Sequence, residues 1–136
     1  MPELSKEIKD LEQIRKLKGK RLLTGIAASE GIAVGIVRNI CKQDPQLIAN
    51  MTKGDVIVVK GRNFYEYFPT EKLFDFIKMV GAFVTDQGGR TSHAGIVGRE
   101  LGIPVVTGTV DGTTLLNTGQ KVIVDGTEGA VYSCDQ

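Results

Sequence analysis

Apolar residues near the start of the chain recur at three- and four-residue steps, which is typical of an amphipathic helix. The segment 3–20 is rich in Lys and Glu between these positions. We therefore predict an N-terminal amphipathic helix or linker over residues 1–20, ended by Lys18-Gly19-Lys20-Arg21, and a folded domain over residues 21–136. The helix could pack on this domain or on a partner chain. Its apolar stripe is Leu4, Ile8, Leu11, Ile14 and Leu17.

After this helix, the apolar residues gather in short β-branched runs separated by glycine, a pattern typical of strands. The last run predicts a hairpin around Asp125-Gly126-Thr127-Glu128-Gly129. The predicted strand regions are 25–40, 54–61, 81–87, 103–109 and 120–133.

Helical spacing returns in the segment 70–80, which follows Pro69 and Thr70 as start signals. A further helix is predicted to begin near Thr91 or Ser92 and to end before Gly102. Residues 44–51 suggest a short helix, and residues 111–119 suggest a turn or a single helical turn. Strands and helices interleave, so the pattern predicts an α/β domain with a mixed sheet and helices packed on it.

Composition is that of an ordinary folded domain: 41% apolar and 24% charged residues in a chain of 136. The net charge of +1 gives no basic excess for nucleic acid or anionic lipid. No segment has the roughly 20 apolar residues of a membrane span or the apolar core of a signal peptide. We expect a cytoplasmic protein without nucleic-acid or membrane partners, and core filling or a contact surface for the aromatic cluster at 64–68.

The metal-binding and redox side chains are few. Cys41 and Cys134 lie far apart without a CxxC pair, and His93 is the single histidine of the chain. Neither a zinc site nor a disulfide framework is expected from so few ligands. We therefore predict no metal and no cofactor bound by this chain itself.

The histidine belongs to the segment QGGRTSHAG, residues 87–95, between a predicted strand and a predicted helix. Gly88 and Gly89 allow unusual backbone conformations and leave amide groups uncovered by side chains. The first amides of a helix also lack internal partners, and the helix dipole favours an anion there. His93 is predicted to lie in the first turn, beside a candidate anion site.

A neutral imidazole is a nucleophile, and attack on a phosphoryl group would give phosphohistidine. Phosphoryl transfer depends mainly on positioning and charge stabilisation, which backbone amides, Arg90 and the hydroxyls of Thr91 and Ser92 could supply. The chain has no GxSxG, GxGxxG or Walker motif. From residue chemistry alone, a phosphoryl acceptor and a structural or merely exposed histidine both remain open.

The helix after the histidine contains Gly95 and Gly98, and each glycine costs a helix about 1 kcal/mol relative to alanine. A compensating interaction is therefore expected. We predict a close approach of this helix to the sheet or to another body.

The segment TDQGGRTSHAGIVGRELGIPVVTGT, residues 85–109, resembles the phosphohistidine signature of the phosphoenolpyruvate-utilising enzymes. This family includes phosphoenolpyruvate synthase, pyruvate phosphate dikinase and enzyme I of the sugar phosphotransferase system. The resemblance extends over residues 22–133 through the glycine-rich runs near 25–40, 53–61 and 119–132. It departs at Glu30, where the family usually has proline, and at Gly95 and Gly98, where alanines are customary.

The resemblance implies a swivelling β/β/α phosphohistidine domain in which His93 takes a phosphoryl group at one site and delivers it at another. Gly88, Gly89 and Arg90 would shape and charge the phosphate site, and Thr91 and Ser92 would orient the ring or its phosphate. The partners implied are an ATP-grasp nucleotide-binding domain and a phosphoenolpyruvate/pyruvate-binding barrel, on which Mg²⁺ is expected. The chain would then be a phosphotransferase component that needs partner domains for full activity.

Two other functions remain open for such a domain. It could be a regulatory or interaction module in which a phosphorylated histidine is a signal. It could also be a subunit of a kinase-like complex whose final acceptor is an organic hydroxyl. Both differ from a metabolic carrier in the fate of the phosphoryl group.

Overall fold

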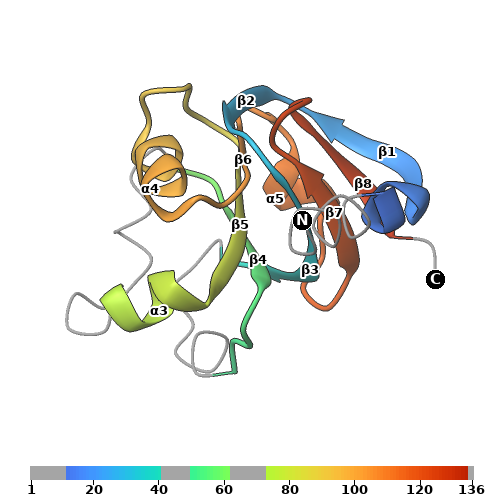
Figure 1. Cartoon of the computed structure of the whole chain (residues 1–136). Helices are drawn as coiled ribbons and strands as arrows, with labels where there is room; N and C mark the ends of the chain where they lie inside the picture. The colour runs from blue at the N-terminus through green and yellow to red at the C-terminus, as the bar shows by residue number, and fades with distance from the viewer. Residues whose placement is uncertain (1–11, 41–49, 62–72, 135–136) are drawn as a thin grey trace, which may run out of the picture.

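The computed structural model describes residues 12–40, 50–61 and 73–134, and it contains eight strands and three complete helices in these ranges. Figure 1 shows helices α3 and α4 on one side of the strands and the hairpin of β7 and β8 on the other. The elements are β1 (Lys18–Thr24), β2 (Ile26–Ser29), β3 (Ile32–Asn39), β4 (Asp55–Val59), α3 (Leu73–Met79), β5 (Val80–Thr85), α4 (His93–Leu101), β6 (Val105–Thr107), α5 (Gly112–Leu115), β7 (Lys121–Asp125) and β8 (Ala130–Cys134).

The strands form one mixed sheet in the order β1-β8-β7-β3-β4-β5-β6-β2. Strands β1, β8, β7 and β3 are antiparallel to their neighbours, whereas β3, β4, β5 and β6 run parallel. Strand β3 changes partner along its length, because Ile32–Ile36 pairs with β7 and Val37–Asn39 pairs with β4. The sheet therefore has an antiparallel half and a parallel half that share β3, and β2 adds to the parallel half as an antiparallel edge strand.

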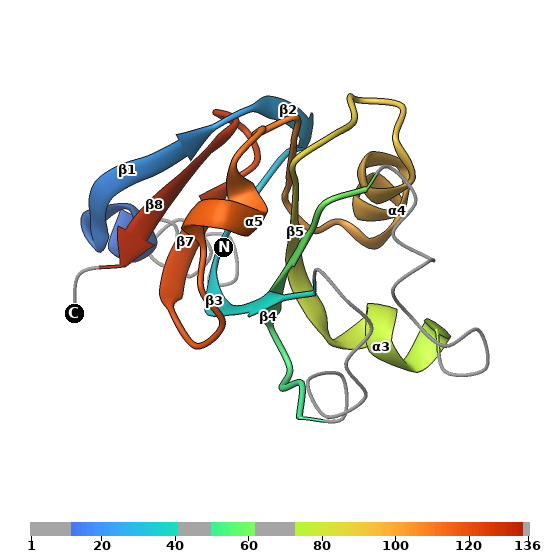
Figure 2. The ribbon, with the colours of Figure 1, turned by 180° about the vertical axis from the view of Figure 1, so that it is seen from behind.

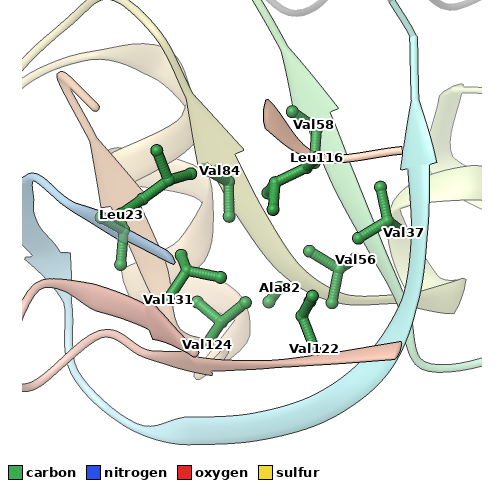
Figure 3. Close-up of a cluster of buried hydrophobic side chains, with 11 residues drawn as sticks. Leu23, Val37, Val56, Val58, Ala82, Val84, Leu116, Val122, Val124 and Val131 are labelled. Carbon is green, nitrogen blue, oxygen red and sulfur yellow. The ribbon is translucent and has the colours of Figure 1, made fainter. Parts of the chain in front are cut away.

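Valine side chains dominate the core between the two halves of the sheet (Figure 3). Alternation along β4 shows how the layers form: Val56 and Val58 face this core, while Ile57 and Val59 face the helices. A parallel strand covered on both faces is expected to be continuously apolar, as β4 is. The core consists of Leu23, Val37, Val56, Val58, Ala82, Val84, Val106, Leu116, Val122, Val124 and Val131.

A second core lies between the parallel half and the helices. Phe83 of β5 and Val105 of β6 contribute to it from the sheet, and Ile77 of α3 and Ala94 of α4 contribute from the helices. Seen from behind, α3 and α4 again lie on the same side of β5 (Figure 2). The molecule thus has three layers, two from the sheet and one from helices, which confirms the predicted α/β class with a mixed sheet.

The predicted N-terminal amphipathic helix is not confirmed. Residues 12–16 are helical, and the earlier residues of the prediction lie outside the described ranges. The predicted end is wrong, because β1 begins at Lys18, inside the range 3–20. The strand was missed because its outward residues are polar and only Leu23 is buried in it, so no alternation marks it. An ion pair attaches β1 to the hairpin of β7 and β8, with Nζ of Lys18 lying 2.8 Å from Oδ2 of Asp125.

Three other predicted elements agree with the structure. The hairpin of β7 and β8, the short helix α5 within 111–119 and the helix after Ser92 are confirmed. The helix predicted over 70–80 contains α3, but Val80 is the first residue of β5. The aromatic cluster at 64–68 lies outside the described residues, as does most of 44–51, of which residues 50 and 51 are not helical.

Strands β1 and β2 are joined by the single residue Gly25, at the point where the chain crosses from one edge of the sheet to the other. The Gly25 amide donates to the carbonyl of Gly129 at 2.8 Å. A Cβ on Gly25 would collide with the carbonyl oxygen of Thr107 and lie 3.0 Å from Cγ2 of Thr109. Glycine is therefore required at this junction by packing.

Within the described ranges, no helix is long and apolar enough to cross a membrane.

Candidate functional site

The candidate site begins where the buried strand β5 ends. Thr85 and Asp86 are 1% and 7% exposed, so the end of the strand is fixed within the molecule, and the segment 86–92 then leads to α4. Figure 1 shows this connection, in yellow, at the top of the view. It leaves the carboxyl ends of the parallel strands, the edge at which open α/β sheets bind ligands.

The two glycines of this loop have different structural roles. Gly88 has φ of 116°, a conformation that side-chain-bearing residues rarely adopt, and a Cβ there would lie 3.1 Å from Cβ of Ser92. A Cβ on Gly89 would meet nothing within 4 Å. Gly88 is thus required by the turn, while Gly89 leaves open space beside the backbone.

Ser92 is the N-cap of α4. Its hydroxyl donates to the carbonyl oxygen of Gly89 at 2.8 Å and accepts from the amide of Gly95 at 3.3 Å. An N-cap side chain satisfies one of the first helical amides in this way. The Ser92 hydroxyl, which the resemblance implies would orient the ring or its phosphate, therefore takes part in holding the glycine turn against the helix.

His93 is the first residue of α4, and its side chain is exposed. Arg90 and Thr91, on the loop before it, are exposed as well. The hydrophobic interior does not enclose the ring, so another molecule can reach it. The predicted residues Gly88, Gly89, Arg90, Thr91, Ser92 and His93 thus form one continuous turn and helix start.

Arg99, which sequence reasoning missed, ties this loop to the sheet. Its Nη1 donates to the carbonyl oxygen of Arg90 at 2.8 Å and to that of Ala28 in β2 at 2.6 Å. A basic residue in the last turn of a helix usually interacts with carbonyls at the helix end. Its sequence position therefore pointed to other partners, and only the packing of α4 against β2 brings it to the loop.

Asp86 is a second residue that sequence reasoning missed. Its carboxylate accepts from the Thr113 amide at 2.8 Å and from the Thr113 hydroxyl at 2.5 Å. A Cβ on Gly112 would lie 2.9 Å from Oδ1 of Asp86, so glycine allows this approach. The carboxylate thereby fixes α5 to the end of β5, beside the start of the glycine turn.

The segment after β6 also borders the glycine turn. The amide and the hydroxyl of Thr109 both donate to the carbonyl oxygen of Thr85 at 3.0 Å. A Cβ on Gly108 would lie 3.2 Å from the carbonyl oxygen of Gly88. The loops that follow β5 and β6 are therefore packed against one another at one edge of the sheet.

The close approach predicted for α4 is confirmed. A Cβ on Gly98 would collide with Cγ2 of Val105 and lie 3.2 Å from Cβ of Ser29. A Cβ on Gly95 would lie 2.8 Å from the Arg90 carbonyl oxygen and 3.2 Å from Cβ of Ala28. The two glycines let the helix lie directly on β2 and β6.

An open cleft of about 690 Å³ adjoins the loop on the side of β2. Two arginines line it, Arg90 and Arg99, together with Glu30 and Thr127. The remaining lining residues are Ala27, Ala28, Ser29, Gly102 and Gly126. Arg90 thus borders both this cleft and the turn before His93.

Over the ranges that the structure describes, no three His, Cys, Asp or Glu side chains gather where they could hold a metal ion.

Comparison with known protein families matches residues 69–129 to the family described as PEP-utilising enzyme, mobile domain. The matched range includes the whole loop, α4 and the segment after β6. It therefore covers every candidate site residue.

Curated relatives extend the similarity to most of the chain. Phosphoenolpyruvate synthase of Aeropyrum pernix is 42% identical over 127 residues, which are 93% of this chain and 14% of the relative. A probable phosphoenolpyruvate synthase of Pyrococcus abyssi is 40% identical over 94% of this chain and 14% of its own length. An uncharacterized phosphotransferase of Bacillus subtilis is 39% identical over 79% of this chain and 12% of its own length. The chain therefore spans about one seventh of the synthases that it matches.

Solved structures agree with these relatives. An enzyme I structure is 35% identical, with a TM-score of 0.50, over 63% of this chain and 33% of that chain. A UPF0107 protein has a TM-score of 0.60 over 85% of this chain and 99% of that chain, but it is 16% identical and shows the fold alone.

Proposed function

Because the chain belongs to the family of mobile domains of phosphoenolpyruvate-utilising enzymes, we propose that His93 carries a phosphoryl group between two sites on partner domains or subunits. The observation that carries this proposal is the place of His93, exposed on the first residue of α4 behind a capped glycine turn. The turn and the helix lie inside the range that matches the family.

The proposed reaction has two steps at the imidazole. In the first step, the lone pair of a ring nitrogen forms a P–N bond, and the P–O bond of the donor breaks with its electrons remaining on the departing oxygen. In the second step, an oxygen of the acceptor forms a new P–O bond, the P–N bond breaks, and its electrons return to the ring. A nucleophilic side chain splits one difficult transfer into two easier ones in this manner.

The residues before His93 support such a transfer by position and charge. The guanidinium of Arg90 would offset the negative charge of the phosphoryl oxygens, and the first amides of α4 would donate to them. Thr91, which precedes Ser92 in the same loop, is exposed as well. Ser92 would act through the helix cap, because its hydroxyl already joins Gly89 to Gly95.

The proposed partners rest on the resemblance of residues 85–109 to the phosphoenolpyruvate-utilising enzymes, not on any contact of this chain. We propose a nucleotide-binding domain of the ATP-grasp type at one end of the relay and a phosphoenolpyruvate/pyruvate-binding barrel at the other. The relatives are several times longer than this chain, which is consistent with further domains in them. The Mg²⁺ expected for this transfer would belong to those partner domains.

The proposal is tested by labelling. The wild type, His93→Ala and the control Lys20→Ala, which removes an exposed charge on β1, are incubated with an extract of the producing cells and with labelled phosphoenolpyruvate or ATP. We expect acid-labile, alkali-stable label on the wild type and on Lys20→Ala, and none on His93→Ala. The isolated phosphoprotein should then lose its label when partner and acceptor are added, with pyruvate tested against AMP and inorganic phosphate.

Two results would contradict the relay. Equal labelling of the wild type and His93→Ala would remove His93 from the reaction. Label that enters but is not passed on to any acceptor would indicate a regulatory module. Passage to an organic hydroxyl instead would keep the relay and change its final acceptor.

A further inference from the structure

The open cleft beside β2 has walls that hydrogen bonds and close packing hold in place. It lies between α4 and the turn that joins β7 to β8 (Figure 1). The amide of Gly126 donates to the carbonyl oxygen of Gly31 at 2.8 Å, and the amide of Gly31 donates to the Thr127 hydroxyl at 2.9 Å. A Cβ on Gly126 would collide with the carbonyl oxygen of Ser29, so the turn lies directly on the end of β2. The cleft is therefore largely formed in advance, as small-molecule sites usually are.

Arg99 brings an oriented guanidinium to this cleft. Its Nη1 donates to the carbonyl oxygens of Ala28 and Arg90, at 2.6 Å and 2.8 Å, which uses both hydrogens of that nitrogen. Among the residues that the structure describes, Nε and Nη2 of Arg99 have no partner. These two nitrogens form a planar fork that can bind two oxygens of one anion. The carbonyl contacts thus orient the fork without occupying it.

Ser29 adds a buried hydroxyl to the lining of the cleft. The residue is 5% exposed, and its Cβ would lie 3.2 Å from a Cβ on Gly98 of α4. Within the described part of the chain, the Ser29 hydroxyl has no hydrogen-bond partner. Buried polar groups are as a rule hydrogen-bonded. An unpartnered hydroxyl in the lining therefore points to a ligand that supplies the missing partner.

The three donors of the cleft come from three different elements: Ser29 from β2, Arg90 from the glycine loop and Arg99 from α4. The contacts of Arg99 bring them together, because Nη1 bonds to the backbone of Arg90 and to that of Ala28, the neighbour of Ser29. No ion pair with either arginine is present over the described ranges. Two guanidinium groups and a hydroxyl are therefore available to one anion.

We propose that this cleft binds a small organic phosphate, a phosphate monoester whose organic part carries hydroxyl groups. The three terminal oxygens of a phosphate match donors from three directions, whereas a carboxylate has only two oxygens. The cleft volume of about 690 Å³ lies within the range of small-molecule sites and leaves room for an organic part beside the phosphate. Glu30 also lines the cleft, and its carboxylate repels an anion but accepts from a hydroxyl. The hydroxyl groups of the ligand are therefore expected at Glu30.

This site is separate from the imidazole. His93 is not among the described residues that line the cleft, and binding requires no phosphoryl transfer. The inference therefore goes beyond the proposed carrier function and does not depend on it.

The test is a titration of the full chain with glycerol 3-phosphate, followed by calorimetry and by the amide NMR signals. Ser29→Ala removes the hydroxyl alone, and Arg99→Lys keeps the positive charge but loses the planar fork. The matched controls are Thr114→Ala, which removes an exposed hydroxyl on α5, and Arg21→Lys, which makes the same exchange at an exposed arginine on β1. Inorganic phosphate, glycerol and succinate are titrated separately.

We expect saturable binding of glycerol 3-phosphate to the wild type, and affinities about tenfold weaker for Ser29→Ala and Arg99→Lys. Both controls and His93→Ala should match the wild type. If Arg99→Lys does not fold, Ser29→Ala decides alone, because the Ser29 hydroxyl holds no other described group.

Four results would overturn the inference. They are the absence of saturable binding to the wild type, equal affinities of Ser29→Ala and the wild type, binding of inorganic phosphate or succinate as tight as that of glycerol 3-phosphate, and loss of binding in His93→Ala. The last result would place the ligand at the imidazole. None of the four bears on whether His93 is labelled, so this inference and the carrier function can fail separately.

Discussion

The hydroxyl of Ser92 donates a hydrogen bond to the carbonyl oxygen of Gly89 at 2.8 Å, and this bond closes the turn directly before His93. The hydroxyl oxygen of Ser92 also accepts a hydrogen bond from the amide of Gly95. One side chain therefore holds both the glycine loop and the first turn of α4. Loop geometry and helix stability therefore depend on the same group.

Replacing this group should weaken both. We expect Ser92→Ala to lower the free energy of unfolding by about 0.5–2 kcal/mol, the usual loss for an N-cap. Urea denaturation measures this change. Ser92→Thr keeps a capping hydroxyl and should retain most of the stability, while equal stability of Ser92→Ala and the wild type would show that the cap contributes nothing.

Alanine at Gly98 should destabilise the protein although it favours helix formation. The added Cβ would collide with Val105 and press on Ser29, so α4 must move away from the sheet. Overpacking of this kind costs about 1–3 kcal/mol, which exceeds the gain of about 1 kcal/mol from helix propensity. The urea midpoint of Gly98→Ala should therefore fall. Glu100→Ala, an exposed position on the same helix, serves as the control. A raised midpoint for Gly98→Ala would contradict the close packing.

Removal of the Arg90 guanidinium should slow phosphorylation of His93 without unfolding the protein. The side chain is exposed, and Arg99 bonds to the backbone carbonyl of Arg90, which the substitution retains. Charge-assisted hydrogen bonds contribute about 1.5–3 kcal/mol, so we expect labelling of Arg90→Ala to be roughly ten- to a hundredfold slower. Arg90→Lys should recover part of the rate. Equal initial rates for Arg90→Ala and the wild type would place Arg90 outside the site.

Stability should fall in acid partly through Asp125. Burial by itself raises the pKa of this carboxyl, but the hydrogen bond and charge of Lys18, with the amides of Glu128 and Thr127, outweigh burial and hold the pKa below its ordinary value of 3.8. A lowered pKa in the folded state means that the ionised form stabilises the fold. This contribution is complete above the pKa of the unfolded chain and is lost as the pH falls through the lower folded value.

Asp125→Asn tests this dependence. The variant should be less stable than the wild type at pH 7, and the difference should shrink as the pH falls below about 4. Urea denaturation at several pH values gives both curves, with Glu30→Gln, an exposed carboxylate, as the control. Parallel curves for Asp125→Asn and the wild type would contradict the role of the Lys18 contact. The contribution of Lys18 to stability depends on pH in the opposite direction, because its pKa is raised in the folded protein. Burial lowers the pKa of this amine but its bond to Asp125 raises it, with a net rise, so its contribution is lost as the pH rises through the raised value.

Much of the site could be predicted from sequence because its signals are local. The two glycines, the capping serine and the start of α4 lie within a few residues of one another, and each has its own backbone preference. Arg99 and Asp86 could not be found in this way, since their partners Ala28 and Thr113 are 71 and 27 residues away. Tertiary packing alone brings these groups together.

The same distinction holds for the fold. The strands with continuous apolar runs, such as β4, were predicted, but β1 was not, because its polar residues carry no alternation. Pairing with β8 and the ion pair of Lys18 hold β1 in place, and both are contacts with the far end of the chain. The positive φ of Val110, 71°, could not be predicted either, because valine by itself indicates an ordinary extended backbone.

The junction at Gly25 has a consequence for association between copies of the protein. Unpaired edge strands offer backbone groups to which another chain can add. Here the two edge strands β1 and β2 follow one another with a single residue between them, and the hairpin end at Gly129 packs against that residue. The borders of the sheet therefore meet at one corner of the molecule, and β2, four residues long, leaves little room there for a foreign strand. At this edge, the short strand β2 therefore offers few free backbone groups to which another chain could add.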